Sequence, residues 1–347
     1  MVFHIEYPRA IPERRPPGHQ PAAPRFSLRW DAPVGLLISD YFALQGQDLG
    51  WEEQAAFFER LEASFGTDGP DAFERMRFAD ETGALNAVLV AYWTDGARHG
   101  RWEHASPFMA WFRDPARLTG PRGVWRETLH VPYDRHETIY STPTYPIGLA
   151  RTPGSRRVAI TTNGYFGAMR DRIPLSAIDA LESPLAALPE RRAPESLGHR
   201  VKVASPLNMI SIRSGQHWEG AGNEQTADYL YNLQPKLMRG MAHLATHPDE
   251  TGTLTLRVMT NLNPDGSPRS ETSVHGYFLS MTLLEEWSKQ HETHLDIYRH
   301  AIAMNRLHKE KREVFTWHEV FALLPGTFSE YVNCHPDTGL LPWFADA

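Results

Sequence analysis

The pattern of apolar and polar positions predicts a chain in which strands and helices alternate. Apolar or alternating runs predict strands at residues 35–47, 84–93, 123–132, 137–141, 208–218, 251–261, 273–281 and 313–324. Apolar positions at helical spacing predict helices at residues 51–65, 106–115, 226–247 and 282–305. Pro235 interrupts the third helix, and a capping box of Thr282 and Glu285 opens the fourth. The predicted fold class is therefore α+β.

The order of these elements nearly repeats along the chain. Each half follows a βαβ-βαβ order, which predicts two ferredoxin-like modules whose sheets pack together. The first module covers residues 31–145 and the second covers residues 201–347, with a connecting insert at residues 146–200. Residues 1–30 form an N-terminal arm whose first part is rich in Pro and Arg, so this part is either extended or disordered.

Composition and charge narrow the class of protein. The 347 residues carry a formal charge of −7, which argues against nucleic acid or an anionic membrane as the main partner. No apolar run reaches the length of a membrane span, and the first residues lack the apolar core of a signal peptide. The single cysteine, Cys334, allows no internal disulfide and reads as a buried inert thiol, with a thiolate ligand to haem as the alternative. We expect a cytoplasmic protein.

The helix predicted at residues 282–305 carries a histidine on its apolar face. His294 shares this face with Trp287, Ile297 and Tyr298. Such a histidine is either a hydrogen-bonded core residue or a ligand to haem iron, which needs a neutral imidazole beside a large apolar slot. Zinc is a weaker alternative, because no HExxH motif is present and no third ligand accompanies His291 and His294.

Four further positions carry groups that can take part in chemistry. His318 lies in a predicted strand between Thr316 and Val320 and reads as a core residue or as a group facing a cavity. The segment GAMRDRIP contains Arg172, which suits a salt-bridged turn or a hydroxyl-binding site. Ser214 reads as a turn serine and Glu137 as an exposed strand residue, so these patterns alone leave the alternatives open.

Five segments together resemble the aldoxime dehydratases, the haem-containing phenylacetaldoxime dehydratase family. These segments are GAMRDRIP, IRSGQHW, HETHLDIY, WHEV and YVNCHPDTGLLP, and the resemblance runs from Tyr41 to Phe344. Glu292 stands where the family usually has proline, which changes the helix locally and leaves the adjoining histidine in place. The resemblance also implies a dimeric α/β-barrel-like fold, which agrees with the two predicted modules.

The resemblance implies a role for each candidate residue. It implies His294 as the proximal ligand to the iron of haem b and His318 as the distal acid/base group. Ser214 is implied as a distal hydrogen-bond donor, Arg172 as a further member of the distal pocket, and Glu137 as an additional catalytic candidate. The implied protein is a homodimer without nucleic-acid or membrane partners.

The resemblance also implies an activity. Aldoximes, R–CH=N–OH, are dehydrated to nitriles and water, with the oxime nitrogen bound to ferrous haem. A histidine suits this reaction because it can protonate the departing hydroxyl near neutral pH and later accept the C–H proton. A haem peroxidase-like enzyme and a non-catalytic haem-binding sensor are the two alternatives, since similar folds host different haem chemistry.

Overall fold

The computed structural model describes residues 2–345 and is built around one antiparallel sheet. Its strand order is β7-β1-β6-β12-β9-β11-β10-β3-β4-β2-β5-β13-β8. The strands are β1 (Arg25–Trp30), β2 (Leu36–Gly46), β3 (Ala72–Ala79), β4 (Leu85–Trp93), β5 (Gly123–Pro132), β6 (His136–Tyr140), β7 (Ser155–Ile160), β8 (Arg200–Ala204), β9 (Ile210–His217), β10 (Thr253–Leu262), β11 (Pro268–Phe278), β12 (Phe315–Ala322) and β13 (Phe328–Val332). The predicted α+β class is confirmed.

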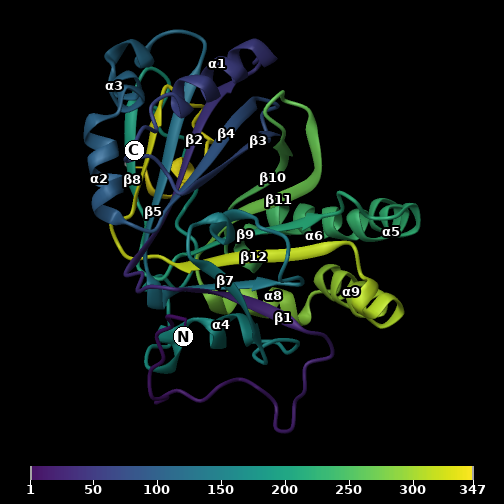
Figure 1. Ribbon diagram of the computed structural model, residues 1–347. Helices are drawn as coiled ribbons and strands as arrows, with labels where there is room; N and C mark the ends of the chain where they lie inside the picture. The colour runs from purple at the N-terminus through teal and green to yellow at the C-terminus, as the bar shows by residue number, and fades with distance from the viewer. Residues whose placement is uncertain (1, 346–347) are drawn as a thin grey trace.

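Helices cover the sheet in two groups (Figure 1). They are α1 (Trp51–Glu62), α2 (Gly96–Ala105), α3 (Pro107–Arg113), α4 (Ala168–Arg172), α5 (Asn223–Asp228), α6 (Gln234–Thr246), α7 (Pro248–Thr251), α8 (Met281–Gln290), α9 (Glu292–His308) and α10 (Leu341–Phe344). The helix predicted at residues 226–247 is interrupted as expected, by a π-helical turn at Tyr229–Leu233 that places Pro235 in the first turn of α6.

The sheet contains two runs of four strands, and the order of strands in the two runs is the same when one run is read from its opposite end. The first is β3-β4-β2-β5, with α1, α2 and α3 packed on it through an apolar cluster that includes Phe42, Phe58 and Trp102. The second is β12-β9-β11-β10, with α6 and α8 packed through a cluster that includes Met241, Leu284 and Val320. Pairing of β10 with β3 joins the two runs.

Buried ion pairs hold the two runs together. Arg213 on β9 lies 2.5 Å from Glu74 on β3, and Arg257 on β10 lies 2.6 Å from Glu127 on β5. All four side chains are nearly inaccessible to solvent, so loss of one partner would leave an uncompensated buried charge. The chain therefore depends on each of these pairs to keep its two halves in one arrangement.

The helix predicted at residues 282–305 differs from the structure in its start and its continuity. The N-cap of α8 is Ser280, whose hydroxyl accepts from the Leu283 amide, so the predicted capping box at Thr282 is wrong. An extended residue, His291, separates α8 from α9, and its side chain caps the second helix. Glu292 occupies the first position of α9, where proline is also common, so the break forms without a proline.

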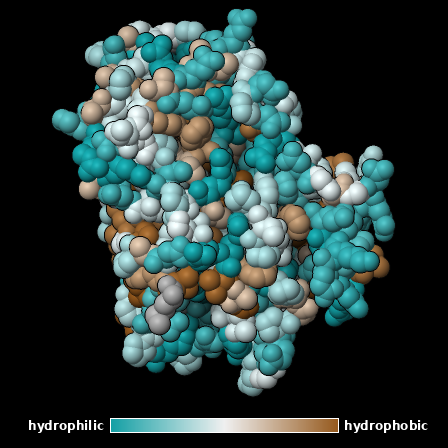
Figure 2. Space-filling model, viewed as in Figure 1, coloured by the Kyte–Doolittle hydropathy of each residue, from teal (hydrophilic) through white to brown (hydrophobic). Residues whose placement is uncertain are grey.

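The N-terminal arm packs against the connecting insert. Arg14 donates its backbone N–H to Asp171, Arg15 bonds Thr162, and His19 bonds the carbonyl of Asn163. None of the helices formed by residues 2–345 combines the length and apolar character that crossing a bilayer requires. The face shown in Figure 2 is mostly hydrophilic, with hydrophobic residues gathered in the lower part of the view.

Candidate functional site

A cavity of about 370 Å³ lies between β12, one face of α9 and the segment that precedes α4. Of the histidines in residues 2–345, only His294 and His318 line it. Much of the remaining wall is apolar, with Ile139, Trp287 and Ile302 among its members. The two histidines that the sequence singled out from separate elements therefore face one common space.

His294 is held in a defined tautomer. The break at His291 starts α9, and the ring of His294 projects from its first turn beside Trp287. Its Nδ1 lies 2.6 Å from the carbonyl oxygen of Ser288, which can only accept, so Nδ1 carries the proton and Nε2 keeps its lone pair. Burial lowers the pKa of this imidazole, which keeps it neutral. These are the properties of a histidine that binds a metal through Nε2.

Strand pairing brings Glu137 and His318 together. β12 pairs with β6 so that His318 lies opposite Ile139 and Val320 lies opposite Glu137. His318 Nε2 is 2.6 Å from Glu137 Oε1, and the imidazole remains partly accessible while the carboxylate is fully buried. Val320 on the same strand face packs into the apolar cluster with Leu284, so His318 lies where the packed region opens into the cavity.

Arg172 completes this cluster from α4. Its Nε donates to Glu137 Oε2 at 2.6 Å and its Nη2 to Oε1 at 3.1 Å, a two-point ion pair. Burial alone would raise the pKa of Glu137, but the charges of Arg172 and His318 lower it to about 2. Arg172 also donates to the Thr162 carbonyl and lines the cavity. Glu137 is therefore an ionised, buried carboxylate that orients both partners.

Ser214 lies beside this cluster without lining the cavity. It is the residue of β9 directly opposite His318 on β12, and both side chains belong to the same face of the sheet. In the part of the chain that the structure describes, its hydroxyl makes no hydrogen bond, so it is free to meet a bound molecule. The structure thus joins His318, Arg172 and Glu137 by direct contact, places Ser214 next to them, and places His294 on the wall of the same cavity.

Comparison with known proteins identifies the family of this chain. A model of the haem-containing dehydratases matches residues 41–340. The chain belongs to the haem-containing dehydratase family. Phenylacetaldoxime dehydratase of Bacillus sp. (strain OxB-1) is 31% identical over 95% of this chain and 94% of its own length. Aliphatic aldoxime dehydratase of Pseudomonas sp. is 30% identical over 97% and 96%, respectively.

Solved structures agree with this membership. An aldoxime dehydratase crystallised in complex with butyraldoxime matches with a TM-score of 0.88 and 28% identity, over 98% of this chain and 94% of that one. A second aldoxime dehydratase structure matches with a TM-score of 0.87 and 27% identity, over 99% of this chain and 97% of that one. The chain is thus a haem-dependent lyase, as its motifs predicted.

The residues around the cavity of this haem-containing dehydratase fit a haem. His294 offers a lone pair from an apolar wall, and the sequence predicted this residue. Arg25 was not predicted, because it is one of several arginines in the N-terminal arm. It also lines the cavity, burial lowers its pKa, and it has no ion-pair partner among residues 2–345. A half-buried cation without a carboxylate partner suits a haem propionate.

The remaining haem-ligand alternatives are not in the cavity. Cys334 is fully buried elsewhere, where its thiol donates to the carbonyl of Val124, and burial raises its pKa to about 12. It is therefore the inert thiol that the sequence favoured. His300 bonds Asp228 and His291 bonds Thr293, and neither lines the cavity. The aromatic residues Tyr165 and Phe166 do line it.

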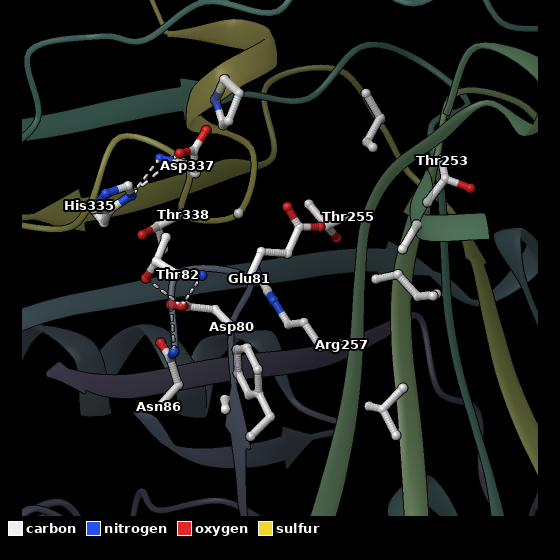
Figure 3. A pocket seen from close by; sticks show the side chains of 18 of the residues that line it. Asp80, Glu81, Thr82, Asn86, Thr253, Thr255, Arg257, His335, Asp337 and Thr338 are labelled. Atoms are coloured by element: carbon white, nitrogen blue, oxygen red, sulfur yellow. Dashed lines mark hydrogen bonds and ion pairs between the residues drawn. The ribbon is translucent and has the colours of Figure 1, made fainter. Parts of the chain in front are cut away.

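A second cavity, of about 300 Å³, lies between β10, the β3–β4 turn and the C-terminal segment (Figure 3). Two of its charged side chains are already engaged. Asp80 accepts from Thr82 and Asn86, and Arg257 is bound by the carboxylate of Glu127. None of the candidate site residues lines this second cavity, so the cavity that contains His294 and His318 is the candidate functional site.

Proposed function

We propose that this haem-containing dehydratase converts aldoximes, R–CH=N–OH, to nitriles and water. The observation that carries this proposal is that the cavity joins a neutral histidine suited to iron, His294, with a histidine held by a buried carboxylate, His318. The relatives named phenylacetaldoxime dehydratase and aliphatic aldoxime dehydratase support it along nearly the whole chain.

His294 would hold haem b through Nε2, and Arg25 would meet a propionate. When bound in the ferrous state, the haem iron supplies a coordination position for the oxime nitrogen and electron density toward the N–O bond. The apolar wall that includes Ile139 and Trp287 would exclude water from this position. Exclusion of water strengthens each hydrogen bond made to the oxime inside the cavity.

His318 would move the two protons of the reaction. As an imidazolium it donates a proton to the oxime oxygen while the N–O bond breaks, and water leaves. The neutral imidazole then accepts the proton of the C–H bond as the nitrile forms, which restores the starting state. Ser214 and Arg172 would orient the oxime hydroxyl toward the imidazole, and Glu137 would orient the imidazole. The reaction has no net redox change.

An assay of the haem-loaded protein tests this proposal. Anaerobic protein reduced with dithionite is given butyraldoxime or phenylacetaldoxime, and the nitrile is measured by gas chromatography. We expect nitrile formation that depends on the ferrous state, with little turnover of the air-oxidised protein. The competing peroxidase-like function predicts turnover of hydrogen peroxide with a phenolic donor and no nitrile. A sensor would bind the aldoxime, seen as a shift of the Soret band, without any product.

We also infer the finer architecture that the element order predicted. The strand orders β3-β4-β2-β5 and β12-β9-β11-β10 are each the order of a ferredoxin-like module, which supports two such modules in one chain. Homodimer formation is proposed from the resemblance alone, and light scattering after size exclusion tests it. A reducing, cytoplasmic location is proposed from the single cysteine, which allows no internal disulfide.

A further inference from the structure

Three side chains outside the proposed reaction converge where α6 meets the junction of α8 and α9. His243 lies on α6, Glu250 on α7, and His291 at the break that precedes α9. One nitrogen of each imidazole and one carboxylate oxygen lie within 4.8 Å of one another. His243 and Glu250 are close in sequence, whereas His291 is more than forty residues away, so the tertiary fold brings His291 to the other two.

The Nε2 atom of His243 is a buried polar atom without a partner. It is inaccessible to solvent and makes no hydrogen bond within residues 2–345. The nearest acidic oxygen, Glu250 Oε1, is 3.7 Å away, which is too long for a hydrogen bond. A polar atom in this state destabilises the fold unless something binds it. Glu250 is exposed, so its carboxylate can turn toward the Nε2 atom of His243.

The imidazole of His291 is held through its Nδ1 atom, which leaves Nε2 as the nitrogen that a metal can reach. His291 Nδ1 lies 2.8 Å from the hydroxyl of Thr293. The backbone N–H of Thr293 donates to the same Nδ1 at 3.3 Å, so Nδ1 accepts and the neutral ring carries its hydrogen on Nε2. Metal binding at Nε2 would shift that hydrogen to Nδ1, where it can donate to the Thr293 hydroxyl. The rings of His243 and His291 stack at 3.7 Å between centroids, and one nitrogen of each lies within 4.8 Å of the other and of a Glu250 oxygen.

We propose that His243, Glu250 and His291 form a binding site for a divalent transition metal such as Zn²⁺. Two imidazoles and one carboxylate are a donor set that zinc accepts, with a fourth position left for water. Ligand atoms around a tetrahedral zinc ion lie roughly 3.3 Å apart, given Zn–N and Zn–O bonds of about 2.1 Å. Rotation of the exposed Glu250 side chain and turning of the stacked rings would close the present arrangement to that spacing.

A metal at this site would tie α6 to the start of α9. His291 caps α9 and lies three residues before His294, the residue that we propose as the haem ligand. Binding at one site in the folded state stabilises that state by mass action. The site is therefore positioned to stabilise the helix that presents His294.

Isothermal titration of the untagged, haem-loaded protein with Zn²⁺, after treatment with a chelator, tests the proposal. We expect one zinc ion per chain. His243→Ala and Glu250→Gln should each weaken binding by at least about tenfold, because even replacements beyond the direct ligands cost that much. Glu250 is exposed, so its variant should fold normally. His104→Ala removes an exposed histidine on α2 and serves as the matched control.

The thermal midpoint gives an independent measurement. Zn²⁺ should raise the midpoint of the wild type and of His104→Ala, and should leave that of Glu250→Gln nearly unchanged. Absence of saturable binding to the wild type would overturn the proposal. Equal binding by the wild type, His243→Ala and Glu250→Gln would overturn it as well, because the metal would then lie elsewhere. Neither measurement uses aldoxime turnover, so failure of the proposed function would not affect them.

Discussion

Glu137 Oε1 lies 2.6 Å from His318 Nε2, and this contact decides which imidazole nitrogen can exchange a proton with a substrate. The carboxylate is ionised, since its pKa is lowered to about 2, and it can only accept. Arg172 Nη2, which can only donate, lies 3.1 Å from the same Nε2 and can bond its lone pair in the neutral imidazole, whereas the imidazolium directs its Nε2–H toward Glu137. In both states protein groups occupy Nε2. Proton transfer to and from a substrate then takes place at Nδ1. Arg172 donates to both oxygens of the Glu137 carboxylate and so holds the carboxylate in this position.

His318→Ala should abolish most turnover while leaving the haem bound. A positioned proton donor contributes about two to four orders of magnitude, so nitrile formation should fall by that factor. The variant should still show the Soret shift on aldoxime addition, because binding and proton transfer are separate functions. Near-normal turnover in the variant, or a failure to hold haem, would show that His318 is misassigned.

Glu137→Gln tests the role of the carboxylate separately. The amide has nearly the same shape but carries no charge, so it no longer stabilises the imidazolium, and its NH₂ group can donate toward the lone pair of His318 Nε2. We expect turnover to fall by at least about tenfold, as when a carboxylate that orients a catalytic histidine is replaced. In the double variant with His318→Ala the loss should not add to that of His318→Ala, because the carboxylate acts through the imidazole. Additive losses would indicate a separate contact between Glu137 and the substrate.

His294→Ala should yield a folded protein with little haem. The imidazole is the one candidate iron ligand on the cavity wall that is neutral and oriented by a backbone carbonyl. Haem content is measured as the ratio of Soret to protein absorbance after purification. His300→Ala is the matched control, since His300 is on the same helix but bonds Asp228. An unchanged Soret band in His294→Ala would transfer the assignment to another residue.

Arg25→Ala should weaken haem retention without removing the iron ligand. The propionates would lose a charge-assisted partner, which is commonly worth about 1.5–3 kcal/mol, or roughly ten- to a hundredfold in affinity. Transfer of haem to apomyoglobin, followed by absorbance, gives the relative rate of loss. Arg9→Ala, in the same arm but outside the cavity wall, is the control. Equal rates of haem loss in both variants and the wild type would exclude Arg25 as a propionate partner.

The sequence predicted most strands and placed His294 on an apolar helix stripe, because these depend on local periodicity. The structure places Trp287, a member of that stripe, beside His294. The role of His294 as an iron ligand came from the resemblance and stays a prediction. β1, β3, β7, β8 and β13 were not predicted, because charged residues interrupt the apolar pattern of each, as in RFSLRW and SRRVAI. The start of α8 was assigned to the wrong residue, because Ser280 and Thr282 both suit a helix cap and only the backbone distinguishes them.

The cluster at His318 could not be derived from periodicity. Glu137 is 35 residues from Arg172, and Arg172 is 146 residues from His318, so no local pattern connects them. Pairing of β6 with β12 and the position of α4 bring them together. Their common function was predicted only through resemblance, and Arg25 escaped notice because a cation in a Pro- and Arg-rich arm carries no positional signal. The geometry of a site assembled from distant segments therefore requires the tertiary structure.

Glu319 on β12 is the source of a pH dependence that concerns stability and not turnover. Its side chain faces away from the cavity, accepts from the Leu149 amide at 2.6 Å and is bonded by the Tyr92 hydroxyl at 3.1 Å. Burial raises its pKa from 4.5 to about 7, and the nearby Glu74 adds to this shift, while Arg213 opposes it. Between these two pH values the folded chain holds a proton that the unfolded chain has released.

The free energy of unfolding should therefore fall as pH rises through this window. A carboxyl whose folded pKa is raised stabilises the fold fully below the unfolded pKa, near 4.5, and the contribution is lost as pH rises to about 7. The shift corresponds to about 3 kcal/mol.

Glu319→Gln removes the titrating group but keeps an acceptor for Leu149, so the variant should match the wild type near pH 4.5 and exceed its stability at pH 8. Thermal midpoints across pH 4.5–8 measure the difference, and Glu310→Gln, at an exposed glutamate, is the control. Parallel profiles for the wild type and Glu319→Gln would mean that the carboxyl is ionised at neutral pH, with Arg213 outweighing its burial.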